Sequence, residues 1–205
     1  MTPRPPDLPA IPAGPPLLII LSGFSGAGKD SVRDLLMDWR LPFHFAVTMT
    51  TRPPRGGEVE AKDYYFVDDA AFDRLEAEDG FIEKAIVYGQ RKGVPRFEVL
   101  APLAAGRDLL ARVDVQGAET LRGLVPDALL IFIAPPSLEE NVRRLAERGT
   151  EPEEERRARL AVAAQEMEAA KRFHHVVVNE TGRLEETARR VVDLIVAEKA
   201  HRAGR

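Results

Sequence analysis

The segment LLIILSGFSGAGKDSVRDLL, residues 17–36, decides the fold. Residues 17–22 form a short, almost wholly apolar run, which is typical of a buried parallel strand. Residues 23–30, GFSGAGKD, match the spacing GxxxxGK, and residues 30–39 carry apolar side chains at the period of an amphipathic helix. A strand, a glycine-rich loop and a helix in this order are the context that identifies a phosphate-binding loop.

The chemistry of this loop favours a nucleotide polyphosphate. Glycines allow successive backbone N–H groups to turn inward around an anion, and the start of the following helix adds the positive end of its dipole. The lysine then reaches the β- and γ-phosphates of the nucleotide. The residues expected to contact ATP are Gly23, Ser25, Gly26, Ala27, Gly28, Lys29, Asp30 and Ser31.

The loop departs from the usual form directly after the lysine. That position normally carries Ser or Thr, whose hydroxyl ligates Mg²⁺, whereas here it is Asp30, with Ser31 next. A carboxylate is a stronger ligand for a hard cation than a hydroxyl, so one hypothesis is that Asp30 contacts Mg²⁺ directly or through water. The alternative is that Asp30 only stabilises the start of the helix, where acidic residues are favoured. The sequence leaves both open.

Further along the chain, apolar strands alternate with helical patterns. The expected strands are 17–22, 44–50, 64–67, 108–114, 128–134 and 174–180, with a strand or hairpin arm at 81–89. The expected helices are 30–39, one after Asp68 or Asp69, 116–124, one beginning at Ser137, and 184–199. This alternation predicts an α/β fold with a parallel sheet between helices on both faces.

Composition limits the class of protein. The 205 residues contain no cysteine, which excludes disulfides and thiolate metal sites, and the apolar runs are too short to span a bilayer. A net charge of −4 argues against bulk nucleic-acid binding. Residues 1–16 hold seven of the sixteen prolines and no signal-peptide core, so we expect a flexible tail and a cytoplasmic location.

At this point the chain resembles guanylate kinases, from Leu17 almost to the C-terminus. Beyond the phosphate loop, the resemblance rests on separate motifs in the right order. They are TTRPPRGGEV at 50–59, DYYFV at 63–67, FIE at 81–83, DVQGA at 114–118, APPSLEE at 134–140, RLAERGT at 144–150, Arg159, and VN at 178–179. The resemblance implies a core (17–42, 96–136 and 170–205), a GMP-binding lobe (about 43–95) and a helical lid (about 137–169).

The resemblance also implies site residues. Arg52 and Arg55, which flank a rigid Pro-Pro turn, would hold the acceptor phosphate, with Tyr64 adding a hydroxyl. Thr48 and Glu83 would read the guanine edge, because a carboxylate accepts from N1 and N2 and a hydroxyl donates to O6. The further residues it implies are the catalytic Lys29, Arg144, Arg148 and Arg159, the ATP contact Asn179, and Asp114 as a second Mg²⁺ ligand beside Asp30.

Two positions depart from the family pattern within the acceptor site. Lys92 stands where the family has a tyrosine that contacts the acceptor phosphate, and it keeps the charge logic. Arg112, two residues before Asp114, stands where an acidic residue that receives the base edge is usual. We count Arg112 among the GMP-binding residues, but from sequence it could pair with Glu83 or Asp30, donate to O6, or reach a phosphate.

The resulting hypothesis is an Mg²⁺-dependent ATP:GMP phosphotransferase, with dGMP as a second acceptor, acting as a monomer or homodimer without nucleic-acid or membrane partners. One alternative is a kinase for another phosphorylated acceptor, because the GKDS form of the loop resembles ribose 1,5-bisphosphate phosphokinases. A second is a non-enzymatic guanylate kinase-like binding module. Such modules lose the phosphate loop, whereas this chain keeps Lys29.

Overall fold

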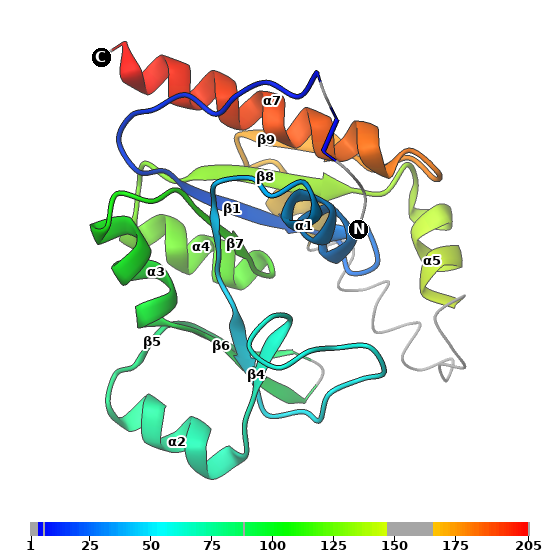
Figure 1. Ribbon diagram of the computed structural model, residues 1–205. Coiled ribbons are helices and arrows are strands. Elements are labelled where there is room, and N and C mark those ends of the chain that lie inside the picture. The colour runs from blue at the N-terminus through cyan, green and yellow to red at the C-terminus, as the bar shows by residue number, and fades with distance from the viewer. Residues whose placement is uncertain (1–3, 6, 88, 147–165, 205) are drawn as a thin grey trace. The chain divides into compact units, whose positions relative to one another are not determined.

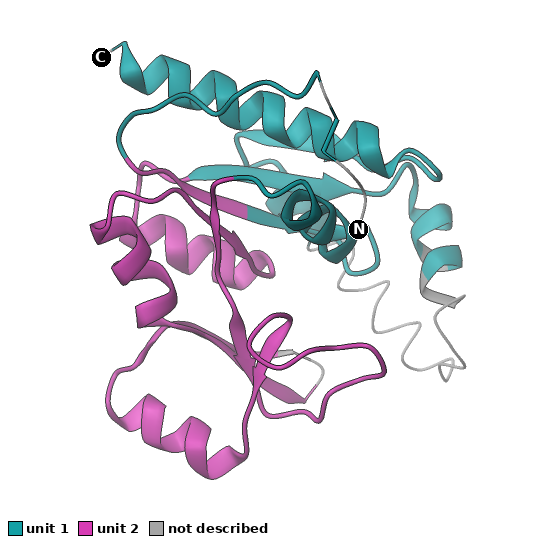
Figure 2. Ribbon diagram, viewed as in Figure 1, with its two compact units in different colours: residues 1–15, 21–41, 129–205 teal, residues 16–20, 42–128 magenta. Residues whose placement is uncertain are grey.

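The computed structural model describes residues 4–5, 7–87, 89–146 and 166–204 of the chain (Figure 1). It divides into two compact units, shown in Figure 2: unit 1 comprises residues 1–15, 21–41 and 129–205, and unit 2 comprises residues 16–20 and 42–128. The first strand passes from unit 2 into unit 1. Within the described part of the chain, no helix combines the length and the apolar character needed to cross a membrane.

Unit 1 contains one side of a parallel sheet. Its strand order is β1-β8-β9, and β8 pairs in parallel with β9 from Ile131 beside His175 to Ala134 beside Val178. The elements of this unit are β1 (Leu18–Gly23, from Leu21 onward), α1 (Lys29–Asp38), β8 (Leu129–Ala134), α5 (Leu138–Ala146), β9 (His175–Val178) and α7 (Leu184–Ala203). The interior strands are uninterrupted apolar runs because both faces are covered; Phe132, fully buried, makes ring contacts with Phe24 and Phe173.

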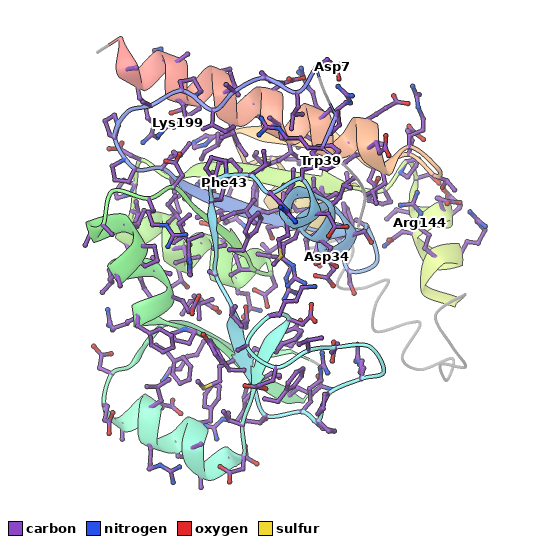
Figure 3. All side chains as sticks on the ribbon, viewed as in Figure 1. Asp7, Asp34, Trp39, Phe43, Arg144 and Lys199 are labelled. Carbon is purple, nitrogen blue, oxygen red and sulfur yellow. The ribbon has the colours of Figure 1, made fainter. Side chains whose placement is uncertain are left out.

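The proline-rich segment lies against α7 rather than extending as the flexible tail expected from its composition. Asp7 forms a two-pronged ion pair with Arg189, at 2.8 and 2.9 Å, and Leu8 is buried. Near the other end of α7, the buried Lys199 donates to the carbonyl of Pro15 at 2.9 Å; Figure 3 labels Asp7 and Lys199 along this helix. Proline fixes the backbone but leaves carbonyl oxygens free to accept, and Lys199 uses one of them.

Unit 2 contains two groups of strands. In the first, β2 (His44–Phe45) pairs in parallel with β7 (Leu109–Arg112), which lies beside the first half of β1. The second is a four-stranded sheet in the order β4 (Tyr64–Phe66), β3 (Thr48–Thr50), β6 (Gln90–Pro95) and β5 (Phe81–Val87). The helices of the unit are α2 (Asp69–Ala77), α3 (Arg96–Ala104) and α4 (Val115–Leu124). The mixed α/β class with a parallel sheet is therefore confirmed.

The single strand expected at 44–50 is wrong, because the chain changes sheets at Ala46–Val47. The buried carboxylate of Glu98 on α3 causes the break. It accepts from the Val47 backbone N–H at 3.0 Å and lies 2.8 Å from His44 Nε2, while its other oxygen accepts from the Tyr65 hydroxyl at 2.7 Å. These bonds replace strand pairing at Val47 and fix where β3 begins.

Other boundaries differ by a few residues from those expected. The strand expected at 108–114 ends at Arg112, because Asp114 caps α4 by accepting from the Gly117 N–H at 2.9 Å. Helix α3 was not expected, and it contains Pro102. The caps expected at Asp68 and Ser137 are confirmed by hydrogen bonds to the N–H groups three residues on. The expected division into core, lobe and lid stays a prediction; the two compact units divide the chain differently.

Candidate functional site

The phosphate loop lies in unit 1, between β1 and α1. Gly23 adopts φ +145° and Gly28 adopts φ +92°, conformations that only glycine adopts without strain. At Gly23 a Cβ atom would lie 2.1 Å from the carbonyl oxygen of Ile133, and at Gly28 it would lie 2.4 Å from Asn179 Nδ2. Both glycines of the motif are thus required by close packing as well as by backbone geometry.

Lys29 begins α1 and folds back over the loop. Its Nζ donates to the carbonyl oxygens of Gly23 at 2.7 Å and Phe24 at 2.9 Å. The backbone N–H of Ser25 points to a carboxylate oxygen of Glu166 at 3.4 Å. A loop N–H that faces a carboxylate and a lysine held above it are the parts that an anion site needs.

Asp30 and Ser31 are exposed on the first turn of α1, directly after Lys29. Their carboxylate and hydroxyl oxygens are the donor types that Mg²⁺ accepts, so these residues fit an ion bound with ATP phosphates. Asp30 also stands where an acidic residue favours the helix start. Among the described residues, no group of three or more His, Asp or Glu side chains is placed to hold a metal ion.

Asn179 holds the phosphate loop from below. It is buried, its Nδ2 donates to the carbonyl oxygen of Ala27 at 2.7 Å, and its Oδ1 accepts from the hydroxyl of Thr187 at 3.0 Å. Both ends of the amide are therefore engaged inside the protein. These contacts support a role in holding the loop and give no structural support to the ATP-base contact expected from the resemblance.

Arg144 lies on α5, and Figure 3 labels it there. Its Nη2 donates to the carbonyl oxygen of Asn179 at 2.9 Å and to the Thr181 hydroxyl at 2.8 Å, and its Nε donates to Glu140 at 3.0 Å. Hydrogen bonds from Arg143, Thr181 and Arg144 lower the pKa of the Glu140 carboxyl to about 2. The network ties α5 to the segment after β9. The other two expected arginines, Arg148 and Arg159, lie outside the described residues.

Glu83 is the buried carboxyl group of unit 2. It lies on β5, and burial together with the nearby charge of Asp114 raises the pKa of its carboxyl to about 8. Gly117 at the start of α4 makes room for it, since a Cβ there would lie 2.9 Å from Glu83 Cδ. Thr48, the other expected base contact, is buried at the start of β3 in the same sheet.

Three cationic side chains surround the ring of Tyr64 in unit 2. The guanidinium carbons of Arg52 and Arg112 lie 4.8 and 5.0 Å from the ring centroid, and Lys92 Nζ lies 5.8 Å from it. Arg112 Nη1 also donates to the Tyr64 hydroxyl at 2.9 Å. Strand register contributes, because β3 pairs with both β4 and β6 and places Thr48 beside Tyr64 and Thr50 beside Lys92. The structure thus brings four expected acceptor-site residues together.

Glu58 completes the loop that carries the two predicted phosphate ligands. Its oxygens accept from Arg52 Nη1 and Nη2 at 2.7 and 2.5 Å, and one of them also accepts from the Arg55 backbone N–H at 2.7 Å. These bonds hold the pKa of the Glu58 carboxyl below its usual range. The Arg55 side chain is exposed at the same turn. Arg52 is therefore buried and oriented by Glu58, a residue that the sequence analysis did not single out.

Asp114 has two observed roles in unit 2. One oxygen caps α4, and the charge of the carboxylate acts on Glu83. The Mg²⁺ role expected for it stays a prediction. The sequence analysis missed four supporting residues: Glu58, Glu98, Glu140 and Thr187. Only Glu58, three residues after Arg55 in a Pro/Gly-rich turn, and Glu140, three residues after Ser137, carried a local signal.

Comparisons with known proteins agree with this arrangement. The sequence profile described as guanylate kinase matches residues 16–198. A guanylate kinase of Thermobifida fusca is 49% identical over 165 residues, covering 80% of this chain and 84% of that protein, and one of Thermus thermophilus is 43% identical over 188 residues, covering 92% and 84%. The crystal structure of a guanylate kinase from Anaplasma phagocytophilum superposes with a TM-score of 0.73 at 34% identity, covering 91% and 87%.

Proposed function

We propose residue roles for this chain, which belongs to the guanylate kinase family and catalyses the ATP-dependent phosphorylation of GMP to GDP. The observation that carries the assignment of roles is in unit 2. A buried carboxyl group, Glu83, which suits the donors of a guanine edge, accompanies a cationic cluster around Tyr64, which suits a phosphate. The relatives do not favour a ribose 1,5-bisphosphate kinase or a non-enzymatic module.

The phosphates of ATP bind the loop of unit 1 in this proposal. The residues involved are Gly23, Ser25, Gly26, Ala27, Gly28, Lys29, Asp30 and Ser31. Lys29 exchanges its two carbonyl partners for the β- and γ-phosphate oxygens. Asn179 acts indirectly, by fixing Ala27 and therefore the curvature of the loop.

GMP, with dGMP as a second acceptor, binds to residues of unit 2. Thr48 and Glu83 bind the base, and the phosphate is bound by Arg52, Arg55, Tyr64, Lys92 and Arg112. Because the pKa of Glu83 is about 8, base binding to the carboxylate draws on the ionised fraction at neutral pH. Two N–H donors of guanine would replace the water that burial removes.

Phosphoryl transfer requires positioning and charge stabilisation more than acid–base chemistry. The acceptor phosphate is already an oxyanion, so the scheme includes no general base. Transfer is direct and in line, with no covalent enzyme intermediate. We propose that Lys29 and the arginines 144, 148 and 159 stabilise the charge on the transferring group, and that closure of the lid excludes water.

Mg²⁺ bound with ATP supplies electrostatic neutralisation of the β- and γ-phosphates. Asp30 is the residue of unit 1 that we propose to hold it, directly or through water, and Asp114 is the candidate in unit 2. An Asp30→Ser variant, which restores the usual hydroxyl, should shift the Mg²⁺ concentration for half-maximal activity. An unchanged Mg²⁺ dependence would leave Asp30 only its role at the helix start.

The test is ADP formation from Mg·ATP with a panel of acceptors: GMP, dGMP, AMP, IMP, UMP, CMP and ribose 1,5-bisphosphate. Turnover is expected with GMP and dGMP alone. Lys29→Met should lower kcat by at least about a hundredfold, since it removes a charge aimed at the transferring phosphate. Lys171→Met, at an exposed surface lysine paired with Glu168, is the matched control and should leave kcat unchanged. Turnover of ribose 1,5-bisphosphate but not GMP would overturn the proposal.

The cytoplasmic location, the monomeric or dimeric state and the lack of nucleic-acid and membrane partners expected from the sequence remain predictions. Size-exclusion chromatography with light scattering at assay concentration would determine the oligomeric state.

A further inference from the structure

Arg112 is the residue at which this chain departs most from its family, and the structure shows what it contacts. It ends β7, is half-buried, and donates from Nη1 to the Tyr64 hydroxyl at 2.9 Å. Its guanidinium carbon lies 5.0 Å from the centroid of the same ring. A planar group that both stacks on a ring and donates to its hydroxyl has one well-defined orientation.

The same ring gathers two more cations. Arg52 lies over it at 4.8 Å, and Lys92 at 5.8 Å. Like charges this close repel each other, so an anion bound among them gains from all three. Glu58 already occupies the outer fork of Arg52 through two hydrogen bonds. An incoming phosphate therefore depends on donors other than the Nη pair of Arg52, and Arg112 supplies a second guanidinium fork beside the same hydroxyl.

The guanine edge is the less suitable place for Arg112. The base-reading carboxyl, Glu83, has its pKa raised by burial and by Asp114, whereas a guanidinium paired with it would lower that pKa. Guanine also presents two N–H donors on that edge, and Arg112 has no acceptor to offer them. The contact with Tyr64 instead directs Arg112 to the hydroxyl that the proposed scheme places on the acceptor phosphate.

We propose that Arg112 is a ligand of the 5′-phosphate of the acceptor nucleotide, acting with Lys92 and the hydroxyl of Tyr64. The inference rests on the proposed function. It names the part of GMP that Arg112 recognises, which is the phosphomonoester and not the base. Arg112 therefore strengthens binding of any acceptor that carries this dianion, and selection of guanine depends on Thr48 and Glu83.

The experiment separates the two parts of the ligand. Dissociation constants for GMP, guanosine and ribose 5-phosphate are measured by calorimetry for the wild type and for Arg112→Gln, Arg112→Lys and the control Arg107→Gln, an exposed arginine of the same unit. Loss of one charge-assisted contact predicts that Arg112→Gln binds GMP and ribose 5-phosphate about 10- to 100-fold more weakly, with guanosine binding changed less than about twofold. Arg112→Lys should recover part of the loss.

Two results would overturn the inference. An equal loss for guanosine and GMP would place Arg112 on the base, and no loss for any of the three would remove it from the site. Circular dichroism and the thermal midpoint of each variant identify misfolding, and the charge-preserving Arg112→Lys keeps the test valid if Arg112→Gln unfolds. A wild type that binds ribose 5-phosphate through Arg112 but does not phosphorylate GMP would refute the proposed function and leave the phosphate contact standing.

Discussion

The hydrogen bond from Thr187 to Asn179 allows a quantitative test of how the phosphate loop is held. Thr187→Val keeps the shape of the side chain, so it opens no cavity, but it removes the hydroxyl that donates to Asn179 Oδ1 at 3.0 Å. The Arg183 carbonyl also loses this donor, yet it keeps the Thr187 backbone N–H at 3.1 Å. The main consequence is therefore one buried acceptor, Asn179 Oδ1, left without its partner.

An orphaned buried acceptor costs about 1–3 kcal/mol, so the free energy of unfolding measured in urea should fall by that amount. If about half of this cost reaches the loop through the bond from Asn179 to Ala27, the KM for ATP rises about two- to tenfold. The KM for GMP should stay within error, because GMP binds residues of unit 2. A variant that only lowered overall stability would not separate the two KM values in this way.

The matched control is Thr120→Val on α4. Thr120 makes the same local bond, from its hydroxyl to the carbonyl four residues earlier, but it is exposed. Its replacement should change the free energy of unfolding by less than about 0.5 kcal/mol. If Thr187→Val costs no more than Thr120→Val, the reasoning is refuted. A double-mutant cycle with Asn179→Ala should show a coupling of about 0.5–3 kcal/mol, because the two side chains share one bond.

Three further predictions follow from single positions. Burial and Asp114 raise the pKa of Glu83 to about 8, so the KM for GMP should fall as pH rises from 6 to 8, while the free energy of unfolding also falls as pH rises from about 4.5 to 8, since the folded state keeps a proton there that the unfolded state releases. Gly28→Ala should weaken binding of an ATP analogue at least about a hundredfold by calorimetry, because its Cβ would meet Asn179 Nδ2 at 2.4 Å and its φ is +92°. Lys199→Ala should lower the free energy of unfolding by about 1–3 kcal/mol without changing kcat.

Each of these has its own control. Glu83→Gln does not titrate, so a pH dependence of the KM for GMP that survives in it would contradict the assignment. Gly123→Ala, at a helical glycine with open space around its Cβ position, should leave nucleotide binding unchanged. Lys171→Ala, at an exposed lysine, should cost less than about 0.5 kcal/mol, and a similar cost at Lys199 would show that the proline-rich segment is held weakly.

The parts of the fold that depend on short-range chemistry could be predicted from the sequence. An uninterrupted apolar run such as 128–134 has few alternatives to a buried strand, and the glycines of the phosphate loop define their backbone locally. The break at Ala46–Val47 could not be predicted, because it depends on Glu98, fifty-one residues after Val47. The packing of residues 7–15 on α7 likewise depends on Arg189 and Lys199, far away in sequence.

The candidate site shows the same division. The loop glycines and Lys29 could be assigned because their roles follow from contiguous backbone. The role of Arg112 stayed open because its partner, Tyr64, lies forty-eight residues earlier and belongs to another sheet of the same unit. Asn179 was expected to contact the ATP base; only the structure shows its amide buried between Ala27 and Thr187, 152 and 8 residues away.

The cations of the two nucleotide sites share one feature that bears on substrate affinity. Lys29 is held by two carbonyl oxygens, and Arg52 by the carboxylate of Glu58. Arg144 is likewise held by Glu140 and by the Asn179 carbonyl oxygen. A phosphate that binds these side chains exchanges one oxygen partner for another, so its affinity reports the difference between the two contacts. Removing Glu58 would therefore strengthen the attraction of Arg52 for a phosphate but release its orientation, and the sign of the change in KM for GMP would tell which effect is larger.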